Sequence, residues 1–67
     1  MKSDELLFDE AKKLHINGEI KNAQVIYLQL LKKNSNNSNL LFLLATTCVQ
    51  LNDYQKGKDF INKSLKI

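Results

Sequence analysis

The chain has 67 residues, a net charge of +3 and 43% hydrophobic residues, a size that allows one small domain and a composition too apolar for intrinsic disorder. The longest apolar run, residues 40–45, falls far short of the roughly 18 residues that span a bilayer, and the acidic start Ser3-Asp4-Glu5 does not resemble a secretory signal, so we expect a cytoplasmic protein that does not bind membranes. All ten basic residues are lysines, whereas proteins that read nucleic acids favour arginine, so we expect no nucleic-acid partner.

The first predicted helix covers residues 4–17. Ser3 is a suitable N-cap, because its hydroxyl accepts a hydrogen bond from a free backbone N–H of the first turn. Gly18 follows the helix and favours the left-handed conformation that ends many helices. Apolar residues repeat at helical spacing along this segment and predict one buried stripe of Leu7, Ala11 and Leu14.

Three further helices are predicted over residues 20–33, 38–51 and 54–66. The second is apolar on nearly all sides, which indicates neighbours on more than one face. A run of asparagine and serine separates it from the third, with Asn37 or Ser38 as the N-cap. Asn52 takes the place of glycine in the next turn, since asparagine tolerates the left-handed conformation. Gly57 costs its helix about 1 kcal/mol relative to alanine, so its presence indicates a tight helix contact.

One pattern occurs twice at a spacing of 34 residues, because Leu6-Leu7-Phe8-x-x-Ala11 returns as Leu40-Leu41-Phe42-x-x-Ala45. A repeat of this length is typical of stacked pairs of helices. The chain resembles a pair of tetratricopeptide repeats, one over residues 4–37 and the other over residues 38–67. The resemblance implies an all-α fold of two tandem helix-turn-helix hairpins, with four antiparallel helices that form a fragment of an α-solenoid without a capping helix.

The resemblance rests on large and small residues at the fixed positions of the family. The first repeat matches at Leu7, Ala11, Leu14, Gly18, Ala23 and Tyr27. The second matches at Leu41, Leu44, Ala45, Cys48, Asp53, Tyr54, Gly57 and Ser64. The pattern places both tyrosines in the core, and it places small residues where two helices approach closely. The chain departs from the family at Leu30, Ser35, Asn52 and Ile61, where a smaller residue, a proline, a glycine and an aromatic residue are usual.

In this family the first helix of each repeat lines a ligand groove, so the resemblance implies a scaffold that binds a protein or peptide. By position, the first repeat contributes Phe8, Lys12 and His15, and the second contributes Asn39, Phe42, Leu43, Thr46 and Val49. Relatives that hold a peptide carboxylate use basic and amide side chains at fixed groove positions. Lys12 matches one such position, but Phe8 and Leu43 occupy others, so we expect an apolar segment as the ligand.

The fourth predicted helix carries apolar residues that no predicted neighbour covers, namely Phe60, Ile61, Leu65 and Ile67. Because exposed apolar patches favour association, we expect either a homo-oligomer or a longer protein whose next helix packs there. Two alternatives to a binding module therefore stay open. One is that the chain is a self-associating helical unit or a fragment of a larger repeat protein. The other is that it is the repeat segment of a larger enzyme.

The residues that carry chemistry do not form a catalytic pattern. His15 is the one histidine, lacks a partner for a triad or a metal site, and is interpreted as a polar surface residue. Cys48 is the one cysteine and lies in the middle of a predicted helix, where it is interpreted as a small buried side chain. The sequence has no glycine-rich phosphate loop and no CxxC pair. We therefore expect no catalytic residue, no cofactor and no metal site.

Overall fold

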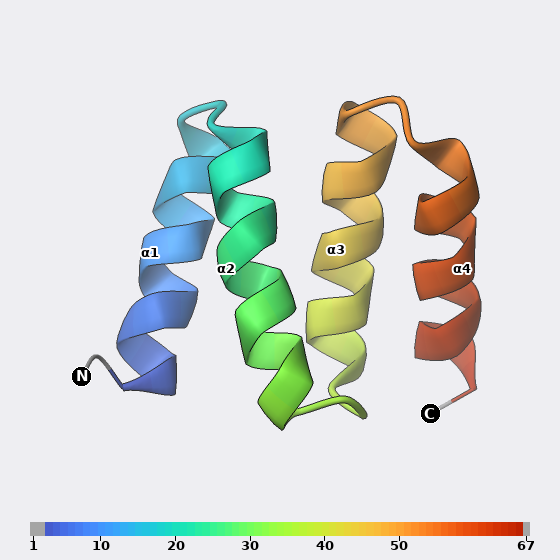
Figure 1. The fold of residues 1–67 in the computed structure, drawn as a ribbon, viewed down its shortest axis with the longest axis horizontal. Helices are drawn as coiled ribbons and strands as arrows, with labels where there is room; N and C mark the ends of the chain where they lie inside the picture. The colour runs from blue at the N-terminus through green and yellow to red at the C-terminus, as the bar shows by residue number, and fades with distance from the viewer. Residues whose placement is uncertain (1–2, 67) are drawn as a thin grey trace.

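The computed structural model describes residues 3–66, and over that range the protein forms four α-helices and no strand. The helices are α1 (Asp4–Ile16), α2 (Ile20–Lys33), α3 (Ser38–Gln50) and α4 (Tyr54–Leu65). Figure 1 shows them side by side in chain order, each joined to the next at alternating ends, and every consecutive pair is in contact. The all-α prediction and its four helices are confirmed, with three helix ends one residue earlier than predicted.

Side chains cap three of the four helix N-termini, and two of these caps are predicted from the sequence. The Ser3 hydroxyl accepts a hydrogen bond from the Leu6 backbone N–H at 3.2 Å. The side chain of Asn37 does the same for Leu40 at 3.2 Å, which makes Asn37 and not Ser38 the cap of α3. Asp53 caps α4 by accepting from the Lys56 N–H at 3.4 Å. These bonds satisfy backbone donors that the helix itself leaves unpaired.

Two turns depend on the left-handed backbone conformation. Gly18 has φ +87° and Asn52 has φ +65°, so both predicted turn residues are confirmed. The Asn52 side chain also accepts a hydrogen bond from the Tyr54 hydroxyl at 2.9 Å. Tyr54 is exposed as a result, and its predicted place in the core is wrong. As the first residue of α4, it lies beside the turn and its hydroxyl bonds locally instead of entering the helix interface.

The core runs through the first three helices. Its fully buried cluster consists of Ala11, Ala23, Tyr27, Leu30, Leu40 and Leu44, and partly buried side chains that include Leu7, Leu14 and Phe60 pack against it. Helix α3 is buried on more than one side, because it contacts both α2 and α4. Its buried hydroxyl, that of Thr47, donates to the Leu44 carbonyl at 2.7 Å and accepts from the Gln24 amide at 3.2 Å. The one buried polar side chain among the described core residues is therefore fully paired.

Gly57 is the point of closest approach between α3 and α4. A Cβ at this position would lie 3.2 Å from Val49 Cγ2, 3.3 Å from the Ala45 carbonyl oxygen and 3.5 Å from Cys48 Cβ. The nearest backbone atom is a carbonyl oxygen inside α3, which does not move as freely as a side-chain end. The tight contact predicted from this glycine is confirmed.

Replacing Gly57 with leucine will force α3 and α4 apart. We expect Gly57→Leu to lower the free energy of unfolding by about 1–3 kcal/mol through overpacking. Urea denaturation followed by circular dichroism measures this change. The matched control is Gln55→Leu at an exposed position of the same helix, where the expected change is within about 0.5 kcal/mol. Equal losses in the two variants would contradict the packing assigned to Gly57.

Two buried weak acids, Cys48 and Tyr27, make the stability of the fold decrease at high pH. Burial raises the pKa of the Cys48 thiol above its usual 9.0, and the charge of Asp53 adds to the shift. Burial also raises the pKa of Tyr27 above its usual 10.0. Both groups ionise more easily in the unfolded chain, so the stability they contribute is complete below their usual pKa values and is lost as the pH rises.

We therefore expect the free energy of unfolding to decrease from about pH 9 upward. In Cys48→Ala the decrease should start nearer pH 10, because Tyr27 is then the remaining buried acid of the two. Urea unfolding at a series of pH values measures the onset. An onset that does not move in Cys48→Ala would show that thiol ionisation is not coupled to unfolding.

Candidate protein interface

His15 joins three helices on the face that the sequence assigns to a groove. Its Nε2 lies 2.6 Å from Gln50 Oε1 on α3, and its Nδ1 lies 3.3 Å from the Tyr27 hydroxyl on α2. In the neutral tautomer protonated on Nε2, the ring donates to Gln50 and accepts from Tyr27, so both bonds form at once. The sequence interpretation of His15 as a polar surface residue missed this bridge between helices.

Phe8 and Lys12 of α1 already have partners within the chain. The Phe8 ring packs edge-on against Tyr27 with 6.1 Å between ring centroids. The Lys12 ammonium lies 4.9 Å from the centre of the Phe8 ring and 3.9 Å from Asp9 Oδ1. Both contacts of Lys12 are with exposed or half-exposed groups, so they hold the side chain weakly. Phe8 is therefore held in place by the core, whereas the Lys12 side chain is held only weakly.

Helix α3 presents an exposed apolar strip, which we call the α3 strip and which consists of Phe42, Thr46 and Val49. These residues are spaced i, i+4 and i+7, so they lie on one side of the helix. The side chains of Phe42 and Val49 are 57% and 49% exposed. The Thr46 hydroxyl donates to the Phe42 carbonyl at 3.0 Å, so it does not require a partner from outside.

The other two predicted groove residues of α3 differ in their accessibility. Asn39 is exposed in the first turn of α3. Leu43 is partly buried and packs against the core cluster. The structure therefore places Asn39 beside the α3 strip at its N-terminal end, whereas the Leu43 side chain packs partly against the core.

A hollow of about 210 Å³ extends the α3 strip toward α4. We call it the α3–α4 hollow, and it is lined by Ala45, Thr46, Val49, Gln50 and Ile61. It brings Ile61, predicted as a self-association residue, next to the predicted groove residues Thr46 and Val49. From the sequence, the groove residues and the self-association residues belong to separate surfaces. Their proximity depends on how α3 and α4 pack, which local sequence does not determine.

The predicted apolar patch on α4 does not form as one surface. Phe60 is partly buried and packs against the core cluster, so the prediction that it is uncovered is wrong. Ile61 is also partly buried, whereas Leu65 is largely exposed. Ile67 lies outside the described residues. Consecutive helical residues point about 100° apart, so Phe60 turns inward while Ile61 faces the α3–α4 hollow.

The described residues contain neither a candidate metal site nor a candidate membrane span. Among residues 3–66, no three side chains of histidine, cysteine, aspartate or glutamate gather in a way that would hold a metal ion. None of the helices in this range has the length and apolar character needed to cross a bilayer.

Comparisons with known proteins were made at three levels. No family model matches the chain, no curated protein matches it, and no solved structure matches it. The candidate interface therefore rests on the residues and distances described above.

The hydrogen bond between His15 and Gln50 predicts an energetic coupling between α1 and α3. In a double-mutant cycle of His15→Ala and Gln50→Ala, we expect a coupling of about 0.5–1.5 kcal/mol in the free energy of unfolding. Urea denaturation of the four proteins gives this value. A cycle of His15→Ala with Gln55→Ala serves as the control, because no hydrogen bond joins those residues, on α1 and α4, in the described structure. Equal couplings in both cycles would contradict the bridge.

Proposed function

We propose that the chain is a protein-interaction module of two tetratricopeptide-like repeats that binds an apolar helix or extended segment of another protein. The observation that carries this proposal is the half-exposed state of Phe42 and Val49 on one side of α3. Aromatic and branched apolar side chains held on a rigid helix are effective anchors for a partner. On α1, Phe8 and His15 are held in place by Tyr27, and His15 also bonds to Gln50 of α3.

The 34-residue spacing supports a helix as the ligand. The positions of Ala11, His15 and Tyr27 correspond, 34 residues later, to those of Ala45, Val49 and Ile61. In the first half of the chain, Ala11 and Tyr27 share the core cluster with Leu40 and Leu44 of α3, and His15 bonds to Gln50. In the second half, the corresponding residues line the open α3–α4 hollow. A helix that resembles α3 in its apolar spacing fits this hollow.

A second copy of the chain fits the hollow less well than a different partner. Helix α3 meets the first half of the chain through Leu40, Leu44 and Thr47, all of which are buried. The positions 34 residues earlier on α1 are Leu6, Glu10 and Lys13. Docking α1 of another copy in the same register would bury two charged side chains against an apolar surface, which is unfavourable.

The proposal includes no catalytic role. The reactive groups nearest the interface are already engaged, since both ring nitrogens of His15 have partners and Lys12 contacts Phe8 and Asp9. The Cys48 thiol is buried and its pKa is raised, so it is a poor nucleophile.

A library of displayed helical peptides tests the proposed function. We expect peptides selected on the wild-type protein to include a class that binds Phe42→Gln at least about tenfold more weakly, because Phe42 is a central anchor. The matched control is Leu65→Gln, which removes an exposed apolar side chain outside the α3 strip. Fluorescence anisotropy with labelled peptides gives the affinities.

Two outcomes would contradict this proposal. One is that all selected peptides bind wild type and Phe42→Gln equally. The other is self-association, which light scattering detects as a mass above 7.7 kDa that rises with protein concentration and returns to the monomer in Ile61→Gln. That second result would assign the α3–α4 hollow to another copy of the chain.

A further inference from the structure

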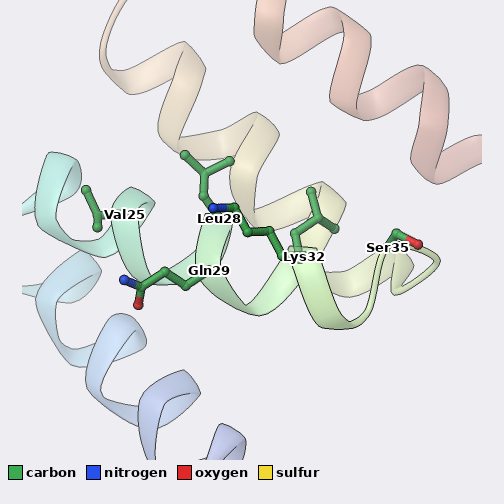
Figure 2. Close-up of a pocket in the computed structure, with 6 residues that line it drawn as sticks. Val25, Leu28, Gln29, Lys32 and Ser35 are labelled. Carbon is green, nitrogen blue, oxygen red and sulfur yellow. The ribbon is translucent and has the colours of Figure 1, made fainter.

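A second concave surface lies on α2 and shares no residue with the α3 strip or the α3–α4 hollow. We call it the α2 trough, and its lining consists of Val25, Leu28, Gln29, Leu31, Lys32 and Ser35. Figure 2 shows these residues along α2 and into the turn that follows it. The trough has a volume of about 590 Å³, and the side chains of Val25 and Leu28 are 52% and 40% exposed.

The α2 trough continues into a smaller hollow that carries positive charge. This lysine hollow, of about 410 Å³, is lined by Ser35, Asn36, Leu41, Lys63 and Lys66. Ser35 lines both concavities, so the two adjoin at the turn between α2 and α3. Together they gather three lysines, Lys32, Lys63 and Lys66, and neither lining contains an aspartate or a glutamate.

The three lysines are available to a partner. The ion pairs formed by lysines in residues 3–66 involve Lys12 with Asp9 and Lys33 with Asp4, at 3.9 and 3.4 Å. Lys32, Lys63 and Lys66 are exposed and have no such pair in that range. A cluster of unpaired cations beside an apolar trough attracts a ligand that is apolar on one side and negatively charged at its edge.

We propose that the α2 trough and the lysine hollow form a second docking surface, and that its occupant is an acidic amphipathic helix of a partner protein. The part of α2 from Val25 to Lys32 extends about 10 Å along the surface, a length that about two turns of a partner helix cover. Apolar side chains at i, i+3 and i+7 of the partner enter the α2 trough. Its glutamates or aspartates lie at the end marked by Lys32, Lys63 and Lys66.

Other occupants fit these features less well. A membrane surface is bound by apolar side chains that protrude, whereas here the apolar surface is hollow. Another copy of the chain offers acidic residues mainly on α1, including Asp4 and Asp9. Leu7, Ala11 and Leu14 of α1 pack against its own core. The exposed apolar side chains of α1, Leu6 and Ile16, lie ten positions apart, so this helix offers no apolar side with i, i+3 and i+7 spacing.

The test uses displayed helical peptides with leucine fixed at i, i+3 and i+7 and with glutamate, lysine, alanine or glutamine allowed elsewhere. Selection on Phe42→Gln removes peptides that depend on the α3 strip. We expect the selected pool to be enriched in glutamate over lysine. We also expect its members to bind at least tenfold more weakly to the double variant Val25→Gln/Leu28→Gln and to Lys32→Glu/Lys63→Glu.

The controls separate this surface from the proposed function. Circular dichroism checks that the substituted proteins, all changed at exposed positions, keep their helix content. Enrichment of lysine, or equal binding to Val25→Gln/Leu28→Gln and wild type, would overturn the second docking surface and leave the α3 strip untouched. Binding to phosphatidylserine vesicles without selection of any acidic peptide would overturn it in favour of a membrane. Failure to select any peptide on Phe42→Gln, while the same library yields binders on the wild type, would also overturn it, because binding would then require the α3 strip.

Discussion

Close contact between helices at small residues is the constraint on which this structure depends. Ala11, Ala23 and Ala45 are buried, and at Gly57 an added Cβ would meet the backbone of α3 at 3.3 Å. A chain this short buries a modest share of its surface, so its stability depends on dense packing more than on core size. Side-chain size at these four positions therefore fixes the spacing of the helices and, through it, the shape of every surface described above.

Tyr27 links this core to the candidate interface. Its ring is buried among the residues of the core cluster, while its edge contacts Phe8 and its hydroxyl reaches His15. Phe8 and His15 are thus positioned by the core, and a ligand would not have to order them. Preorganised side chains bind with a smaller loss of conformational entropy. The chain has its open apolar surfaces elsewhere, on α3 and on α2, where exposed side chains lie on helices that the same core holds in place.

Local sequence was enough to predict the four helices, because caps and turn residues act within a few positions. Ser3, Gly18 and Asn52 are examples whose geometry follows from their own chemistry. Long-range packing was harder to predict. Tyr54 was assigned to the core by its place in a family pattern, but its hydroxyl bonds in the adjacent turn. The bridge from His15 to Gln50 spans 35 positions and depends on how α1 and α3 lie. The apolar character of α2 on nearly all sides indicated further neighbours, but it did not show that Val25 and Leu28 stay open to solvent in the α2 trough.

Proton NOE spectroscopy tests the packing at small residues most directly, since a chain of 7.7 kDa gives resolved spectra. One of the two α-protons of Gly57 occupies the space where an added Cβ would lie 3.2 Å from Val49 Cγ2. We expect strong cross-peaks between these α-protons and a Val49 methyl group, together with cross-peaks to Cys48. If Gly57 shows cross-peaks with water and with its own helix alone, α3 and α4 do not meet at this glycine, and the surfaces derived from their packing do not exist.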